Sequence, residues 1–91
     1  MTTIKLSHRD IVKGERRNCG ACPIALSVNR RLKPGFHCEI ENTYGYVYNH
    51  KRAKHFKLPL NAVAFIQDFD SQEVDVEPFQ FEVDIPNECL K

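Results

Sequence analysis

Hydrophobic and polar positions follow two different periods along this chain. Alternation of apolar with polar residues, the period of a half-buried strand, recurs in five stretches: 2–6, 36–41, 44–48, 53–58 and 79–85. Apolar residues at helical spacing predict a central helix over about residues 21–33 and a second main helix over about 59–69. Pro23 and Pro59 suit the first turns of these helices, because a proline there loses no hydrogen bond.

A shorter helix is predicted between the first strand and the central helix. Ser7 and Asp10 have the spacing of a variant capping box, and Gly14 follows the last helical residue, Lys13. The order of elements is then strand, short helix, helix, three strands, helix, strand. We therefore predict a single α+β domain over residues 1–91, with a small antiparallel-dominated sheet of about four or five strands and two main helices packed on one face.

Three amphipathic patterns indicate one core. Its expected members are the inward residues of the two main helices and the last strand: Ile24, Val28, Leu32, Phe65, Ile66, Phe69, Phe79, Phe81 and Val83. On the central helix, Ser27, Arg30 and Arg31 lie opposite the apolar stripe, and we expect them to face water or a partner. Because exposed side chains add little stability, Arg30 and Arg31 are expected to contribute little to the fold.

The composition is that of an ordinary globular protein, with 42% hydrophobic and 27% charged residues. No apolar run approaches the roughly 20 residues of a membrane span, and residues 1–10 lack the apolar core of a signal peptide. We therefore expect a cytoplasmic protein in which the four cysteines are reduced.

Charge is divided unevenly, although the net charge is only +1. Residues 1–57 contain 12 Lys or Arg residues and four Asp or Glu residues, whereas residues 68–91 contain eight Asp or Glu residues and one Lys. The two halves either pair with each other in the fold or leave a basic surface for an anionic partner. The sequence leaves both alternatives open.

The cations gather in three short segments, and a row of tyrosines lies beside the third. Arginine binds phosphate and carboxylate groups through parallel hydrogen bonds, and tyrosine rings stack on bases or anchor protein interfaces. We therefore predict an RNA- and protein-binding surface formed by Arg16, Arg17, Arg30, Arg31, Lys33, Tyr46, Tyr48, Lys51, Arg52 and Lys54.

The pair Cys19 and Cys22 has the spacing of redox and zinc motifs. A thioredoxin-like motif follows a buried strand, and the charged residues 15–17 do not form one. The nearest further zinc ligands, His37 and Cys38, are adjacent in a predicted strand and point to opposite faces. The sequence also lacks a nucleophile elbow and a glycine-rich phosphate loop. We therefore expect no cofactor, no metal and no enzymatic activity, with a zinc-stabilised adaptor as an alternative.

The stretch from Lys5 to Arg31, KLSHRDIVKGERRNCGACPIALSVNRR, resembles the opening of small phage and prophage proteins. Those proteins commonly combine a short H-I-x-x-G helix with Cys-Pro-hydrophobic-Ala-Leu and an arginine-bearing helix. The stretch from Leu58 to Phe81 is similar to their proline-led helix and Pro-Phe-x-Phe strand. Cys19 is not part of their pattern.

Some proteins of this kind look like anti-CRISPR proteins, and the resemblance implies a phage-encoded, stoichiometric inhibitor without enzymatic activity. Its partner would be a type I RNA-guided surveillance complex in the cytoplasm of the bacterial host, and its effect would be to block target DNA binding. The basic residues would contact guide RNA or the groove for target DNA, or the acidic half would mimic DNA. The resemblance implies no membrane and no small-molecule substrate. The alternative is a small phage nucleic-acid-binding or regulatory protein that binds DNA or RNA directly.

Overall fold

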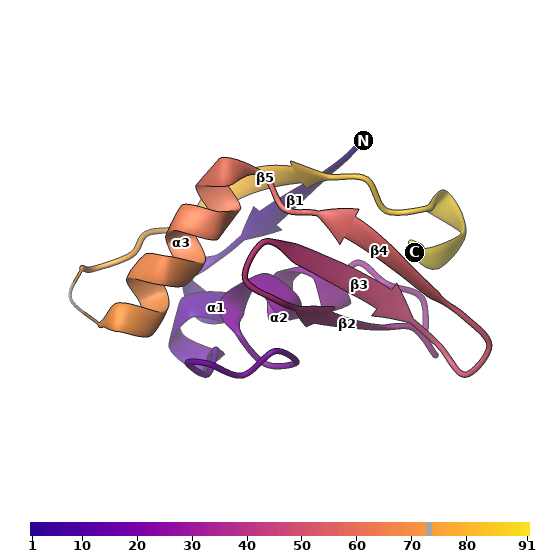
Figure 1. Ribbon diagram of the computed structural model, residues 1–91, viewed down its shortest axis with the longest axis horizontal. Coiled ribbons are helices and arrows are strands. Elements are labelled where there is room, and N and C mark those ends of the chain that lie inside the picture. Colours follow the sequence, from indigo (N-terminus) through magenta and orange to yellow (C-terminus); the bar gives the residue numbers. More distant parts are fainter. Residues whose placement is uncertain (73) are drawn as a thin grey trace.

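The computed structural model describes residues 1–72 and 74–91. Along the described chain (Figure 1) the elements are β1 (Thr2–Leu6), α1 (His8–Lys13), α2 (Pro23–Asn29), β2 (His37–Ile40), β3 (Tyr44–Tyr48), β4 (Ala53–Lys57), α3 (Leu60–Ser71), β5 (Phe79–Val83) and the short 3-10 helix η1 (Asn87–Cys89). Every predicted helix and strand is present, and α2 is shorter than predicted at both ends.

The strands form two antiparallel sheets. β1 pairs with β5, which places Ile4 opposite Phe81, and β2, β3 and β4 form a meander in chain order. The predicted α+β class and antiparallel pairing are confirmed. Instead of one sheet with both main helices on one face, the described strands divide between two sheets, and α2 contacts both β1 and β2 (Figure 1).

Helix α2 has no exposed residue. Ile24 and Val28 are completely buried, and so is Ser27. The expectation that Ser27 faces water or a partner is wrong, because α1, β1 and β2 together enclose a helix that a single sheet would leave open on one side. The Ser27 hydroxyl donates a hydrogen bond to the Ile24 carbonyl at 2.7 Å, so its burial leaves no unpaired hydroxyl.

Side chains fix both ends of α2. The Cys22 sulfur accepts a hydrogen bond from the Ala25 N–H at 3.4 Å, so Cys22 caps the helix. At the other end, the Asn29 amide accepts from the Cys38 N–H at 2.9 Å and donates to the Cys38 carbonyl at 3.4 Å. Leu32 forms an isolated antiparallel β-bridge with Leu90, so it belongs to extended backbone and not to the helix. Helix α2 therefore ends at Asn29 and not near residue 33.

Helix α1 begins as predicted. The Asp10 N–H donates to Ser7 Oγ at 3.3 Å and the Ser7 N–H donates to the Asp10 carboxylate at 2.8 Å, which completes the capping box. Gly14 ends the helix with an extended backbone. A side chain at Gly14 would place its Cβ 2.5 Å from the Pro23 ring, so this glycine allows α1 to approach α2.

The predicted core is confirmed. All its predicted members are buried except Ile66 and Phe79, which are partly buried and pack against the rest. The Phe79 ring lies 5.0 Å from the Phe65 ring and 5.5 Å from the Phe81 ring, measured between centroids. These aromatic contacts join α3 to β5.

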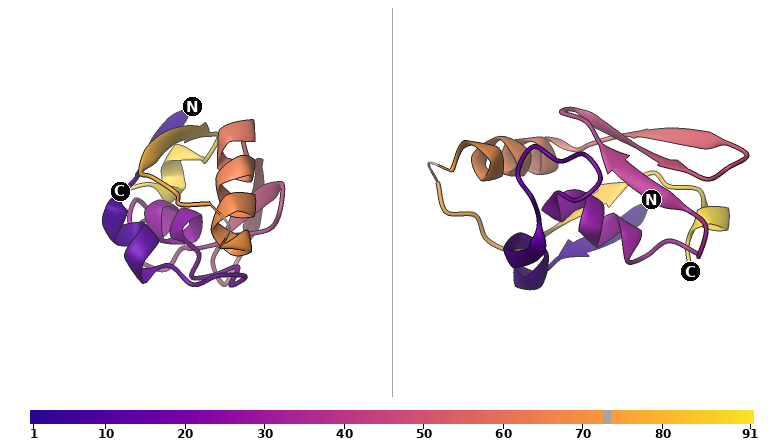
Figure 2. Two further views of the ribbon diagram at one scale, coloured as in Figure 1. Left: turned by 90° about the vertical axis from the view of Figure 1, so that its left-hand side faces the viewer. Right: turned by 90° about the horizontal axis from the view of Figure 1, so that it is seen from below.

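The molecule measures 39 × 22 × 21 Å, and basic and acidic residues meet at both ends of its long axis. The β3–β4 turn, which contains Lys51 and Arg52, lies at one end, and the last turn of α3, which contains Asp70, lies at the other (Figures 1 and 2). Of the two ion pairs between described residues, only the pair of Arg52 with Glu88 joins the basic half to the acidic half. Among the described helices, none has the length and apolarity to span a bilayer.

We predict that Phe81→Ala lowers the free energy of unfolding by about 3–5 kcal/mol, because the Phe81 ring is only 2% exposed and its removal leaves a cavity beside Ile4. The control is Val12→Ala, because Val12 is 68% exposed and its truncation should change the stability by no more than about 0.5 kcal/mol. Chemical denaturation measures both values. Equal stability of the two variants would contradict the placement of Phe81 in the core.

Candidate binding face

The outer surface of the sheet β2–β3–β4 is the strongest candidate for a functional surface. The inward side chains of this sheet are buried: Cys38, Ile40, Val47 and Phe56. The alternate positions form the outer surface, which we call the tyrosine face: His37, Glu39, Tyr44, Tyr46, Tyr48, Ala53, His55 and Lys57. The sheet forms one side of the molecule (Figure 2, right), so this surface is open to solvent.

The aromatic rings of the tyrosine face form a continuous row. The Tyr46 ring lies in the middle, 5.7 Å from the Tyr48 ring and 5.5 Å from the His55 ring between centroids. Tyr44 extends the row from His55 at 5.7 Å, and His37 extends it from Tyr48 at 5.6 Å. Neighbouring rings are tilted by 40–43° and do not stack flat on one another.

Glu39 fixes the centre of the row. Its two carboxylate oxygens accept hydrogen bonds from the hydroxyls of Tyr46 at 3.2 Å and Tyr48 at 2.8 Å. The hydrogen bond to Glu39 and burial raise the pKa of both tyrosines. The hydrogen bond is the larger cause for Tyr48, and burial is the larger cause for Tyr46. Both phenols therefore remain protonated donors at neutral pH, and the rings are held in place before a partner binds.

The tyrosine face rests on close packing beneath it. Gly45 lies between Tyr44 and Tyr46 in β3, and a Cβ atom there would lie 2.6 Å from the Phe56 ring and 2.7 Å from the Ile40 side chain. A larger residue would have to push one of these core side chains aside. Gly45 therefore allows the central strand to lie directly on the core.

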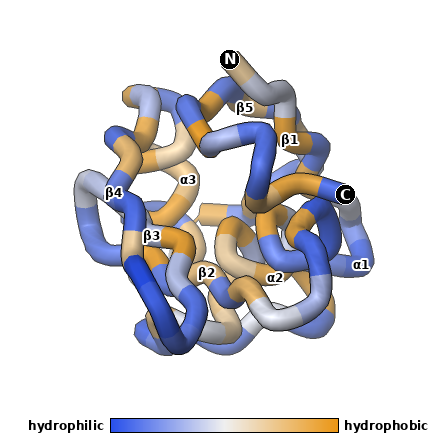
Figure 3. The backbone as a smooth tube through the Cα atoms, turned by 90° about the vertical axis from the view of Figure 1, so that its right-hand side faces the viewer, coloured by the Kyte–Doolittle hydropathy of each residue, from blue (hydrophilic) through white to orange (hydrophobic). Residues whose placement is uncertain are grey.

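The third cationic segment borders the tyrosine face. Lys51 and Arg52 lie in the β3–β4 turn, which is strongly hydrophilic in Figure 3, and Lys57 lies on the face itself. Lys54 is opposite Val47 in the register and belongs to the other side of β4. Arg52 forms an exposed ion pair with Glu88 at 3.1 Å, and such pairs contribute little to stability.

Arg16 and Arg17 lie elsewhere, beside the end of α3. Arg16 Nε donates to the Phe69 carbonyl at 3.0 Å, and the Arg16 guanidinium lies 4.9 Å from the centre of the Phe69 ring. The Arg17 N–H donates to the Asp70 carboxylate at 3.1 Å. Arg17 has a φ of 56°, a left-handed conformation that few residues other than glycine adopt.

Arg30 and Arg31 are tied to the fold. The Arg30 guanidinium donates to both carboxylate oxygens of the buried Asp10, at 2.7 and 3.0 Å, and to the Lys5 carbonyl at 2.9 Å. Arg31 donates to the Thr3 carbonyl at 2.9 Å. The expectation that Arg30 faces only water or a partner is wrong, because its guanidinium is the counter-charge of the buried Asp10 carboxylate. We therefore expect Arg30 to contribute to the fold. The role of both arginines in partner binding stays a prediction.

The predicted partner-binding residues therefore do not share one surface. Tyr46, Tyr48, Lys51 and Arg52 lie together on the β3–β4 hairpin, whereas Arg16 and Arg17 lie beside the end of α3 and Arg30 and Arg31 beside β1. The N–H of Lys33 donates to the Cys89 carbonyl near the C-terminus.

The sequence-based set omitted His37, Glu39 and His55, which contact the tyrosines from the flanking strands. The signal was present, because outward positions of adjacent strands meet across a sheet and all three occupy such positions.

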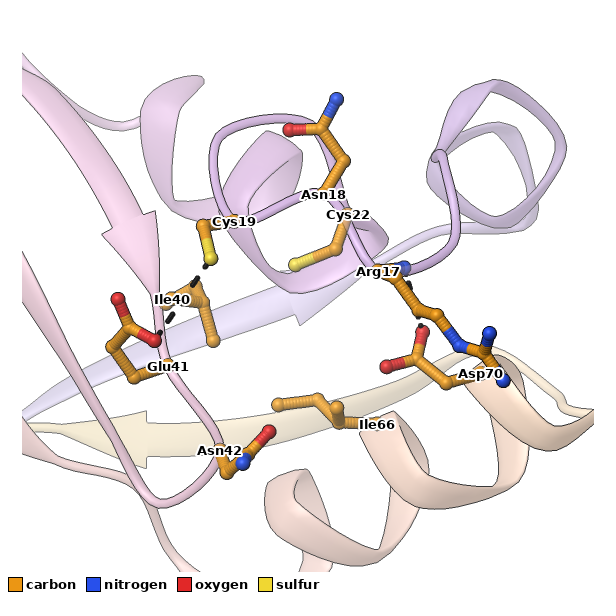
Figure 4. Close-up of a pocket in the computed structure, with 9 residues that line it drawn as sticks. All are labelled: Arg17, Asn18, Cys19, Cys22, Ile40, Glu41, Asn42, Ile66 and Asp70. Carbon is orange, nitrogen blue, oxygen red and sulfur yellow. Dashed lines mark hydrogen bonds between the residues drawn. The ribbon is translucent and has the colours of Figure 1, made fainter.

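A pocket of about 190 Å³ lies between the loop before α2, the end of β2 and α3 (Figure 4). Cys19 and Cys22 line it, and the Cys19 thiol donates to a Glu41 oxygen at 3.9 Å. Ile40 and Ile66 add apolar surface. The pocket therefore brings the paired-thiol motif next to a carboxylate.

The environment of this pocket does not activate the thiols. Burial, followed by the charges of Glu41 and Glu39, raises the pKa of Cys19, and burial raises the pKa of Cys22. Redox and metal-binding cysteines react as thiolates, whereas these two stay protonated at neutral pH. Within residues 1–72 and 74–91, no three His, Cys, Asp or Glu side chains are grouped to hold a metal ion.

We predict that Arg30→Ala lowers the free energy of unfolding by about 1.5–3 kcal/mol, the range for hydrogen bonds to a charged group, because it leaves Asp10 buried without its partner. Chemical denaturation at neutral pH measures this loss. The matched control is Arg9→Ala, an exposed arginine of α1, which should change the stability by no more than about 0.5 kcal/mol.

The loss caused by Arg30→Ala should depend on pH. Burial alone would raise the pKa of Asp10, but the hydrogen bonds and charge of Arg30 and the hydrogen bonds from Ser7 outweigh it, and the pKa lies below its ordinary value of 3.8. A carboxylate with a lowered pKa stabilises the fold above that ordinary value and loses this effect as the pH falls below it. The difference between the parent and Arg30→Ala should therefore shrink below pH 3.8. A difference that does not change with pH would contradict the Asp10–Arg30 interaction.

Comparison of the chain with protein-family models, with curated proteins and with solved structures found no match. Function is therefore inferred from the geometry of the tyrosine face and of the cations that border it.

Proposed function

We propose that this chain is an anti-CRISPR protein, a stoichiometric and non-enzymatic inhibitor that binds a type I RNA-guided surveillance complex. The proposed contact is between the tyrosine face and unpaired guide RNA in that complex. The inhibitor class rests on the resemblance of residues 5–31 and 58–81 to small phage proteins. One observation carries the proposed contact with RNA: a continuous row of tyrosine and histidine rings lies on an open sheet surface with cations at its border.

The rings favour single strands over duplexes. Exposed aromatic side chains on antiparallel sheets stack on unpaired bases, whereas a duplex hides the faces of its bases. Tyr44 is 41% exposed at one side of the row and presents its ring to such a base. Guide RNA must pair with target DNA for the complex to act, so a protein stacked on the guide bases would block target binding.

The charges on the tyrosine face suit bases at its centre and phosphates at its border. The Glu39 carboxylate at the centre repels phosphate but accepts hydrogen bonds from exocyclic amino groups of bases. Lys57 on the face and Lys51 in the turn supply positive charge for the backbone.

We predict that the purified chain prevents a type I surveillance complex from binding target DNA, and that Tyr44→Ala weakens its binding to the complex by about ten-fold or more. The loss is expected because stacking on one ring contributes roughly 1–3 kcal/mol per base. Tyr44→Phe is the matched control, because it retains the ring, and the described residues offer no hydrogen bond to the Tyr44 hydroxyl. Titration of the complex measures affinity, and thermal unfolding checks that both variants are folded.

Salt dependence gives a second readout of the same interface. Lys57→Ala should reduce the slope of log affinity against log salt by about one, whereas Lys13→Ala, an exposed lysine of α1, should not change it. Equal inhibition by the parent and Tyr44→Ala would show that the tyrosine face is not the interface. Tight binding to free single-stranded RNA without an effect on the complex would instead favour a nucleic-acid-binding regulatory protein.

A further inference from the structure

The outer edge of β1 is closed by the chain itself. An edge strand exposes unpaired N–H and C=O groups that attract other strands. In β1, the outward carbonyl of Thr3 accepts a hydrogen bond from Arg31, and that of Lys5 accepts one from Arg30. The two guanidinium groups occupy positions that a neighbouring strand would otherwise take.

The edges of β2 and β5 are also engaged. The N–H and carbonyl of Cys38 bond to the Asn29 amide, and the Ile40 N–H donates to the Cys19 carbonyl. In β5, the Gln80 carbonyl accepts a hydrogen bond from the Asn61 amide at 3.1 Å. Three sheet edges of the described chain thus receive hydrogen bonds from elsewhere in the chain.

The edge of β4 is open. The Asn49 N–H donates to the Arg52 carbonyl and the Leu58 N–H to the Thr43 carbonyl, so every second residue from Arg52 to Leu58 bonds to β3. By this alternation, the backbone groups of Ala53, His55 and Lys57 point away from β3. No described residue bonds to them.

The open edge is basic. Residues 51–57 include Lys51, Arg52, Lys54 and Lys57 and no acidic residue, and of these cations Arg52 is paired with Glu88. Antiparallel pairing of β4 with β4 of a second copy would bring these like charges together, which is unfavourable. An acidic strand is favoured instead. Phosphates alone do not suit this edge, because they only accept hydrogen bonds and the edge alternates donors with acceptors.

An apolar groove adjoins the last residue of β4. It has a volume of about 360 Å³. Met1, Leu58, Pro59 and Leu60 form its apolar lining, and Lys57 and Glu82 add one charge of each sign. Met1 is 89% exposed and Leu60 is 86% exposed. The groove therefore offers apolar contacts to a side chain of any strand that continues past Lys57.

We propose that the β4 edge binds an extended acidic segment of a partner protein by strand addition, with an apolar side chain of that segment in the groove beside Leu60. Recognition combines backbone hydrogen bonds to Ala53, His55 and Lys57 with the positive charge of the strand. This interaction goes beyond the proposed contact of the tyrosine face with RNA, because it depends on backbone groups and not on the rings.

The test uses the full chain and a fluorescein-labelled peptide of alternating valine and glutamate with leucine at both ends. We expect binding by fluorescence anisotropy, together with slower hydrogen exchange of the backbone amides of Ala53, His55 and Lys57. His55→Pro should weaken binding by about ten-fold or more, because proline removes an outward N–H while keeping every bond to β3. His55→Ala is the matched control, which loses the side chain, keeps the N–H and should bind like the parent.

The outcomes separate this proposal from its alternatives. Equal binding by His55→Pro, equal binding of a peptide with lysine in place of glutamate, or no binding of the acidic peptide would overturn it. Self-association that His55→Pro abolishes would identify a second copy as the occupant and also overturn it. If His55→Pro does not fold, Lys54→Glu combined with Lys57→Glu replaces it and should weaken peptide binding at low salt.

Tyr44→Ala should not affect peptide binding, so this proposal and the RNA contact can fail independently.

Discussion

The rest of the structure depends on the burial of α2 on all sides. A helix with no exposed residue must be covered from more than one direction, and α1, β1 and β2 provide this cover. The close approach requires Gly14 beside the Pro23 ring and a small polar residue, Ser27, that bonds to its own helix. With α2 between them, the strands divide into two sheets, and the three-stranded sheet keeps its outer surface open to solvent.

The last residue of α2 and the two residues that follow it close sheet edges. Asn29 bonds to β2, while Arg30 and Arg31 bond to carbonyls of β1. Arg30 also neutralises the buried Asp10, which caps α1, so one guanidinium connects three elements. Arg30 and Arg31 are therefore engaged within the fold, whereas Lys51 and Lys57 of the β3–β4 hairpin form no ion pair with a described residue.

Both proposed interactions use this hairpin, through different groups. The side chains of Ala53, His55 and Lys57 belong to the tyrosine face, whereas their backbone groups form the open edge. A strand added to β4 would therefore extend the sheet next to the proposed RNA-binding rings without covering them. A protein that blocks a nucleoprotein complex by contacting RNA and protein together would benefit from such an arrangement, because two linked contacts bind more tightly than either alone.

The sequence by itself determined the helices and strands, most core residues and the capping box of Ser7 with Asp10, because these depend on residues two to four positions apart. It also indicated that the tyrosines share one side of a strand. Tertiary structure decided which strands pair, and hence that α2 is enclosed, that Ser27 is buried and that Arg30 binds Asp10. It likewise brought Glu39 and His55 to the tyrosines and left β4 as the open edge. Local periodicity does not encode these contacts, because they join residues distant in the chain whose approach depends on how all the elements pack together.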